Sequence, residues 1–241
     1  MTTGMGIATA TPTDMRMTTT DPALRLQSWF SPAFPIGAFS YSHGLEPLID
    51  DGAVDDRESL IAAVETLLAM GSGRVEAAFF AAAWQAAPDV NAAAHLALEA
   101  SAWIPTAELT LEAERQGDAF LQTVSAAWPH PALVALTEAL PERPPLSVVA
   151  GFASAVHGAS LETALPLFLQ AFAVNLISAG VRLVPLGQTD GQIATARLEA
   201  AVAAAAAMAI ADGFDSAWTA TPAHDIHSMR HETQYARIFR S

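Results

Sequence analysis

Residues Leu161–Gln192 read LETALPLFLQAFAVNLISAGVRLVPLGQTDGQ. From Thr163 to Val181 this stretch carries no charge, and apolar residues fall on every side of a helix. A helix that is apolar all round lies either in a protein core or in a membrane. The run is about as long as a bilayer span, but Gln170 and Asn175 interrupt it and no basic cluster flanks it. We therefore expect a buried central helix.

The end of this helix is marked by Gly180, followed by Pro185 and Gly187. Proline and glycine disfavour a simple continuation of a helix. We therefore expect Arg182 just past the helix, in a segment that is presented at the surface.

The whole chain favours helices. It has 241 residues, 52% of them hydrophobic, and many of these are alanines. Alanine is the best helix former, and alternating runs of β-branched or aromatic residues are missing. We predict an all-α protein with a single compact helical domain over residues 21–241. Residues 1–20, rich in Thr, Gly and Pro, are expected to form a disordered tail, without a secretory signal pattern.

Periodicity and capping residues predict the individual helices. Gly117, inside one of them, hints at a close approach of another helix because glycine is costly in a helix. The alanine-rich helix near the C-terminus has small residues that allow close packing, against another helix or another protomer. The expected ranges are 23–30, 56–70, 75–87, 90–102, 106–128, 132–140, 148–157 and 193–211, besides the central helix.

Charge and composition exclude several functions. The net charge is −14, all 11 basic residues are arginines, and there is no cysteine. A nucleic-acid partner is therefore not expected. Without lysine there is neither a phosphate-binding P-loop nor Schiff-base chemistry, and without cysteine there is no thiolate metal site. If nucleotide hydrolysis belongs to this biology, a partner performs it.

Histidines near the C-terminus are the candidate metal ligands. His224, His227 and His231 are spaced i, i+3 and i+7, so a helix would place them on one face, with Asp225 or Glu232 nearby. Such groups bind Zn²⁺ or Ni²⁺, although a solvated polar helix face has the same pattern. No GxSxG nucleophile motif is present. We expect no catalytic residues, no cofactor and no metal ligands in this chain, with the three histidines as the alternative.

Three motifs carry a resemblance to a known family. They are SPAFPIGAFSYSHGLE at residues 31–46, GVRLVPLGQTDGQ at 180–192, and SMRHETQYARIFRS at 228–241. Together and in this order, they resemble signatures of the UreF family of urease accessory proteins, from about Leu24 to Ser241. Pro47 departs from the residue usual after Gly-Leu-Glu in that family.

The resemblance implies an all-α, cytoplasmic protein that is not an enzyme and does not enter a membrane. UreF-like proteins bind a partner called UreD or UreH, recruit the GTPase UreG, and help to deliver nickel to apo-urease with GTP hydrolysis. Nickel and GTP would thus be handled by the complex rather than bound by this chain. A homodimer is also implied. A His-tail metal-binding enzyme and a membrane helix protein remain as alternatives from other classes.

The candidate partner-binding residues lie within the three motifs. Aromatic and arginine side chains are enriched among interface hot spots, and a chain end is usually frayed unless something holds it. We expect the tail 222–241 to dock on the UreD-type partner and to be ordered by it. Glu46 and Arg182, beside turns, are expected to face the GTPase, or else to form an ion pair within the chain. The full set is Tyr41, Glu46, Arg182, Gln188, Gln192, His231, Glu232, Tyr235, Arg237, Phe239 and Arg240.

Overall fold

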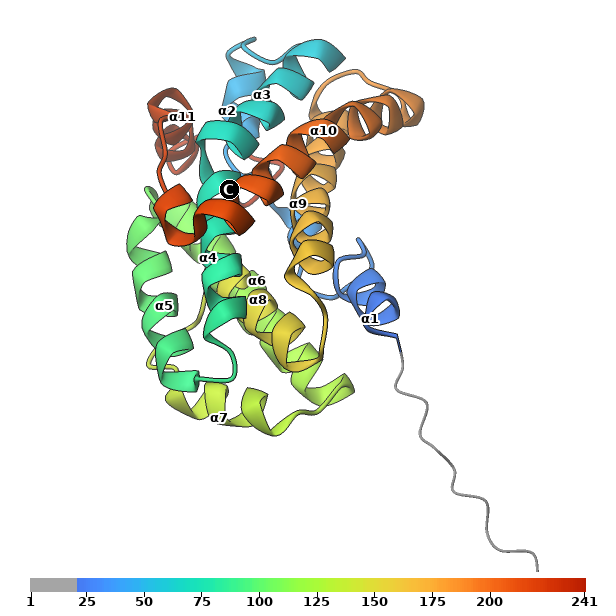
Figure 1. The fold of residues 1–241 in the computed structure, drawn as a ribbon. Helices are drawn as coiled ribbons and strands as arrows, with labels where there is room; N and C mark the ends of the chain where they lie inside the picture. The colour runs from blue at the N-terminus through green and yellow to red at the C-terminus, as the bar shows by residue number, and fades with distance from the viewer. Residues whose placement is uncertain (1–20) are drawn as a thin grey trace, which may run out of the picture.

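The computed structural model describes residues 21–241 and confirms the all-α prediction (Figure 1). The tail predicted at residues 1–20 lies outside the described residues. Within the described part, eleven α-helices and two short 3₁₀ helices form, and no strand. They are α1 (Pro22–Trp29), η1 (Ala38–Ser40), α2 (Leu45–Asp50), α3 (Arg57–Met70), α4 (Ser72–Ala86), α5 (Val90–Trp103), α6 (Ala107–Ala127), α7 (Pro131–Ala139), α8 (Leu146–Val156), α9 (Leu161–Leu183), α10 (Gln188–Asp212), η2 (Gly213–Ser216) and α11 (Pro222–His231).

Side-chain caps explain where several helices begin. Asp21, Asp56, Asp89 and Thr106 each accept a hydrogen bond from a backbone N–H in the first turn of the helix that follows. These bonds satisfy N–H groups that have no partner inside the helix. The four helix starts were therefore readable in the sequence.

Three helices begin earlier than periodicity predicts. The helix α4 starts at Ser72, because only Gly71 leaves the helical conformation. The helix α8 starts at Leu146, directly after Pro145, so Ser147, just before the predicted start at residue 148, is a buried helical residue. The helix α10 starts at Gln188, and its polar first turns belong to the helix.

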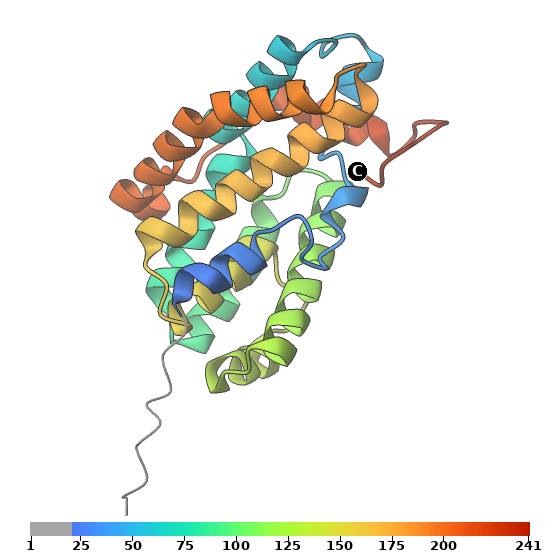
Figure 2. The ribbon, with the colours of Figure 1, turned by 90° about the vertical axis from the view of Figure 1, so that its right-hand side faces the viewer.

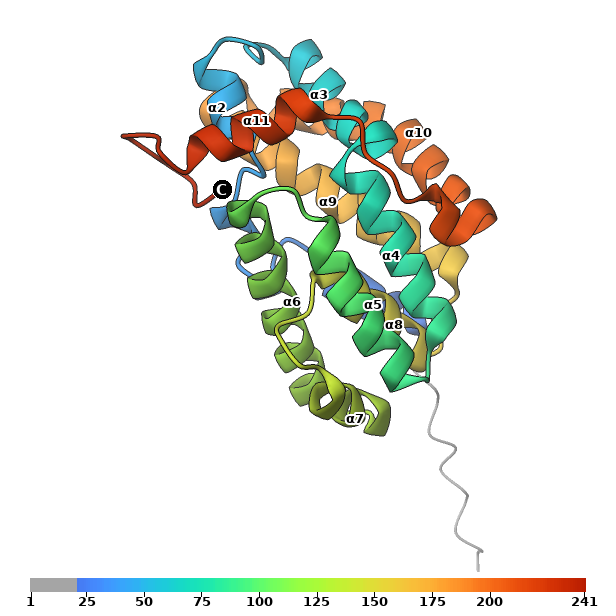
Figure 3. The ribbon, with the colours of Figure 1, turned by 90° about the vertical axis from the view of Figure 1, so that its left-hand side faces the viewer.

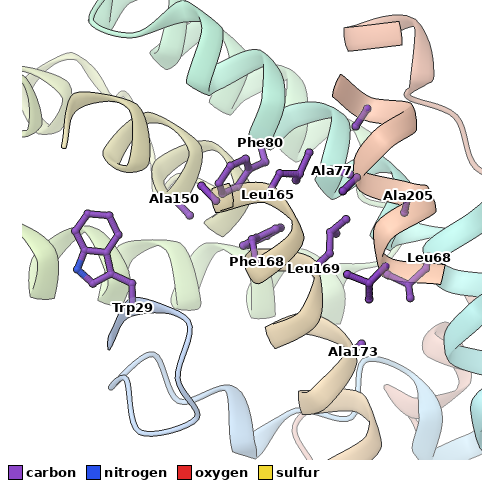
Figure 4. Packing of buried hydrophobic residues seen from close by; sticks show 14 of the residues in the cluster. Trp29, Leu68, Ala77, Phe80, Ala150, Leu165, Phe168, Leu169, Ala173 and Ala205 are labelled. Atoms are coloured by element: carbon purple, nitrogen blue, oxygen red, sulfur yellow. The ribbon is translucent and has the colours of Figure 1, made fainter. Parts of the chain in front are cut away.

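The core lies where α4, α8 and α9 meet. Figure 4 shows Phe80 of α4 beside Leu165, Phe168 and Leu169 of α9, with Ala150 of α8 close by. The ring centroids of Phe80 and Phe168 are 4.9 Å apart. All five side chains are almost completely buried. This packing of apolar side chains supplies most of the stability of such a fold.

Two glycines allow the backbone to come unusually close. A Cβ atom at Gly151 of α8 would lie 2.3 Å from the Phe80 carbonyl oxygen. A Cβ atom at Gly117 of α6 would lie 1.9 Å from the Pro144 carbonyl oxygen. The close approach predicted at Gly117 is thus confirmed, although the segment that approaches is the loop before α8 rather than another helix.

The central helix α9 is less enclosed than its composition predicts. It lies beside α10 along one flank (Figure 2) and also contacts α3, α4 and α8. However, only half of the residues in its most apolar stretch are buried. Its remaining face opens into a groove of about 650 Å³, which Phe30, Phe39, Phe172 and Val181 help to line. The sequence shows that a helix is apolar on all sides, but it does not show whether other helices cover all of those sides.

Within residues 21–241, two helical segments are long and apolar enough to cross a membrane by length and composition, namely α9 and α10 with η2. Core helices of soluble proteins pass the same test. Here α9 and α10 pack against each other, and α10 also packs on α3 and α4. The faces through which α9 and α10 make these contacts belong to the common helical core.

Candidate protein interaction site

The first and last motifs of the sequence meet at one end of the molecule. Figures 2 and 3 show the C-terminal end of the chain beside the segment that contains η1 and beside α6. The Arg240 N–H donates to the Ser40 carbonyl over 2.9 Å, and the Ser42 N–H donates to the Ser241 carbonyl over 2.9 Å. The last residues of the chain are therefore fixed to its own N-terminal motif.

Glu46, in the first turn of α2, binds the backbone of the tail. Its carboxylate accepts hydrogen bonds from the N–H groups of Ile238, over 2.8 Å, and Phe239, over 2.9 Å. It also contacts His231 Nε2 at 3.3 Å. Glu46 is only 3% exposed. The prediction that Glu46 is presented at the surface is therefore wrong, because the tail itself covers it.

His231 links this carboxylate to α6. Its Nδ1 lies 2.6 Å from Glu108 Oε2, while the second oxygen of Glu108 accepts from Arg237 over 2.7 Å. Further along α6, Glu112 accepts from the Ser241 hydroxyl over 2.5 Å. We refer to Glu46, Glu108, Glu112 and His231 as the tail lock. These groups bind the tail to the rest of its own chain. The docking of the tail on a UreD-type partner stays a prediction.

His43 extends the polar network toward the interior. Its Nδ1 lies 3.2 Å from Glu112, and its Nε2 lies 2.8 Å from the Ser72 hydroxyl. Burial opposes the charged imidazolium, but Glu112, with smaller contributions from Glu76 and Asp225, outweighs burial and raises the pKa of His43. The charged form of His43 is thus favoured mainly by Glu112, which also belongs to the tail lock.

Arg182 lies at the surface, as predicted, but in the last turn of α9 rather than beyond it. The helix continues to Leu183, because Pro185 restricts only the residues next to it. The guanidinium donates to the Phe39 carbonyl over 2.8 Å and lies 4.3 Å from the centre of the Phe239 ring. Among the described residues Arg182 makes no ion pair with Glu46, so the alternative of an internal pair is also wrong.

The remaining candidates divide by exposure. Tyr41 and Phe239, like Glu46 and His231, are buried and help to position the tail. The tip of the tail is the most accessible part, since Tyr235 is fully exposed. The exposed candidates are Arg182, Gln188, Gln192, Glu232, Tyr235, Arg237 and Arg240.

The three histidines of the metal hypothesis do not converge. His231 faces Glu46 and Glu108, whereas His227 contacts Asp51 at 3.2 Å. His224 is buried near His43, with ring centroids 6.0 Å apart. Within residues 21–241, no group of three or more His, Cys, Asp or Glu side chains has a geometry that suits a metal ion.

Four apolar side chains of α11 and the tail are exposed, and of these only Tyr235 was among the residues predicted from the sequence. They are Ile226, Met229, Tyr235 and Ile238, each about half exposed or more, and we refer to them as the apolar tail patch. Ile226 and Met229 are three residues apart and share one face of α11. Their spacing in the sequence predicts a shared helix face. Only the burial of His224, Ser228 and His231 shows that the face of Ile226 and Met229 is the outer one. Exposed apolar patches of this kind mark interaction surfaces.

Comparison with known proteins agrees with this architecture. The UreF family model matches residues 54–199. The chain is 45% identical over 226 residues to the urease accessory protein UreF of Granulibacter bethesdensis, covering 92% of this chain and 96% of that protein.

Two further relatives with the same description show similar coverage. The protein of Rhodopseudomonas palustris strain BisB5 is 46% identical over 219 residues, 90% of each chain. The protein of Agrobacterium fabrum is 43% identical over 218 residues, 90% of this chain and 96% of the relative. The described helices, the three motifs and these likenesses agree, and the chain belongs to the UreF family of urease accessory proteins, which are not enzymes.

Proposed function

We propose that this chain bridges a UreD/UreH-type accessory protein and a UreG-type GTPase during maturation of the urease nickel centre. The observation that carries this proposal is the meeting of the first and last motifs at one end of the molecule. There a fixed tail presents exposed aromatic, aliphatic and arginine side chains. A rigid surface of this composition suits protein recognition, because little conformational freedom is lost on binding.

The chemistry of nucleotide hydrolysis belongs to the GTPase in this proposal. The chain contains no lysine and therefore no P-loop of the usual form. Its contribution is to hold partner loops in the geometry that favours nickel transfer to apo-urease. Nickel is the cargo of the complex, and neither nickel nor GTP is a cofactor of this chain.

Two surfaces would serve the two partners. The UreD/UreH-type protein would use the patch of Tyr235 and Ile238 with the neighbouring Arg237. The UreG-type protein would use the end of α9, where Arg182 is exposed close to Gln188. The buried Glu46 acts through the tail and is a positioning residue for both surfaces.

A homodimer is part of the proposal, and the cytoplasm is its site of action. Ala203, Ala204 and Ala207 of α10 are exposed, and only one-third of the most apolar stretch of this helix is buried. Small side chains let two helices approach closely, so these alanines suit contact with a second copy.

The test is reconstitution of nickel-dependent urease activation from purified components. We expect full activation with all partners, and activity near background when this chain, the UreD/UreH-type protein or the UreG-type protein is omitted. The double substitution Tyr235→Ser with Ile238→Ser should abolish capture of the UreD/UreH-type protein. Leu24→Ser, an exposed leucine at the other end of the molecule, is the matched control. Full activation without this chain at low nickel would refute the proposed role.

A further inference from the structure

Most arginines of this acidic chain already have partners within it. Residues 21–241 contain ten of the 11 arginines. Seven of these donate hydrogen bonds to other groups of the described chain, namely Arg25, Arg57, Arg74, Arg182, Arg197, Arg230 and Arg237. With 25 acidic residues in the sequence, this is the expected state of an arginine.

Three arginines differ from the rest. Among the described residues, the guanidinium groups of Arg115 and Arg240 take part in no hydrogen bond or ion pair, and Arg143 reaches Asp118 only at 3.8 Å with 57% of its side chain exposed. All three line one surface hollow of about 450 Å³. The arginines without a close partner therefore gather at one place.

The walls of this hollow are well-ordered parts of the fold. Arg115, Asp118 and Gln122 lie on one face of α6, since they are three, four or seven residues apart. Arg143 comes from the loop before α8, and the segment around η1 forms the opposite side.

Arg240 is held in place although it is the penultimate residue. Its own N–H donates to Ser40, and its neighbours Phe239 and Ser241 are buried. The backbone is thus fixed on both sides of Arg240, while its side chain remains exposed at the hollow. The backbone that carries Arg240 is therefore in place beside the hollow before any ligand arrives.

The charge and size of the hollow indicate its ligand. Three guanidinium groups outweigh the one carboxylate, Asp118, which accepts a hydrogen bond from Gln122 over 3.0 Å. Guanidinium groups bind carboxylates in paired hydrogen bonds. The volume admits several side chains rather than a single small ion. Carboxylates spread along a peptide can reach each arginine separately, whereas one phosphate would concentrate its charge close to Asp118.

We propose that this hollow, lined by Arg115, Arg143 and Arg240, binds an acidic segment of a protein partner that carries two or more carboxylates. The proposal rests on the proposed function, because the segment belongs to one of the maturation proteins. It adds a second, electrostatic contact next to the apolar tail patch. Such contacts raise the association rate and select the partner, and salt weakens them.

The experiment compares two triple variants with the same change in net charge. The first is Arg115→Gln, Arg143→Gln and Arg240→Gln, and the control is Arg57→Gln, Arg197→Gln and Arg230→Gln. Each control arginine is exposed at least in part and is already paired within the chain. Binding of the full chain to the purified UreD/UreH-type and UreG-type proteins is measured by calorimetry at low and at high salt.

We expect the first variant to bind one of the two partners about tenfold more weakly at low salt, with the difference shrinking at high salt. The control should stay within about twofold of the unchanged chain. Equal loss in both variants would point to net charge, and no loss in either would leave the hollow without this role; both outcomes overturn the proposal. If the unchanged chain binds neither partner, the proposed function itself fails.

A third arm separates a free anion from a protein segment. Inorganic phosphate is titrated into the unchanged chain and the first variant at constant ionic strength. We expect no saturable binding to either. Phosphate binding that requires the three arginines, together with unaltered partner affinity in the variant, would overturn the assignment to an acidic protein segment.

Discussion

The interior around α4, α8 and α9 and the tail lock are held by different kinds of interaction. The interior buries apolar side chains such as Phe80 and Leu169 from many directions, without directional bonds. The tail lock holds the last residues through a few hydrogen bonds to Glu46. Apolar packing supports the whole fold at once, whereas the bonds of the tail lock support only the residues that they reach. Damage to the two regions should therefore differ in extent as well as in size.

The largest effect is expected in the interior, for Phe80→Ala. Phe80 is fully buried, and its ring lies 4.9 Å from Phe168 and 6.4 Å from Phe30. Removing it leaves a cavity, and such substitutions lower the free energy of unfolding by about 3–5 kcal/mol. Urea unfolding followed by circular dichroism measures the change. Phe39→Ala is the control, since Phe39 is 68% exposed; equal costs for the two substitutions would contradict the central place of Phe80.

A smaller and local effect is expected for Glu46→Gln in the tail lock. The neutral amide replaces a charged acceptor of two N–H groups, and hydrogen bonds to charged groups contribute about 1.5–3 kcal/mol. Hydrogen exchange should accelerate at the amides of Ile238 and Phe239, while helical circular dichroism stays unchanged.

The exposed Glu232→Gln provides the control for this experiment. If Glu46→Gln instead unfolds the whole chain, the distinction between the interior and the tail lock is lost. If exchange at the two amides does not change, Glu46 does not hold the tail in solution.

The helices could be predicted from the sequence because their signals are local. The caps at Asp56 and Asp89 and the apolar periodicity of α3 lie within a few residues of the helices that they define. The resemblance of the three motifs likewise identified the family. Composition predicted α9 as apolar on every side, but the side that remains open depends on α1 and η1, which are distant in sequence.

The candidate site was less predictable because its contacts are long-range. The turn beside Glu46 predicts an exposed side chain, but the amides that cover it are more than 190 residues further along the chain. The hollow brings together Arg115 of α6, Arg143 of the loop before α8 and Arg240 near the C-terminal end, which are far apart in the sequence. Sequence spacing carries neither kind of information.

The two buried histidines of α11, His224 and His231, differ in their hydrogen-bond partners. His231 has a carboxylate on each ring nitrogen. His224, two turns earlier, is 8% exposed, and its Nε2 has no hydrogen-bond partner in the described residues. Burial, and then the nearby charge of His43, lower the pKa of His224 to about 3. His224 is therefore neutral in the folded chain at neutral pH.

The smallest of the three effects is expected for His224→Gln and concerns pH. Below about pH 6.5 His224 binds a proton in the unfolded chain but not in the folded chain. The free energy of unfolding therefore falls as pH is lowered from about 6.5 toward 3. The slope from this group is about 1 kcal/mol per pH unit, and the substitution should remove it. His43→Gln should act with the opposite sign. The pKa of His43 is raised, so its contribution is present below about pH 6.5 and lost as pH rises through the folded value. The measurement is thermal unfolding of both variants between pH 5 and 8, with each variant compared to the unchanged chain. If the difference from the unchanged chain varies with pH in the same direction for both variants, His224 is not buried as a neutral group.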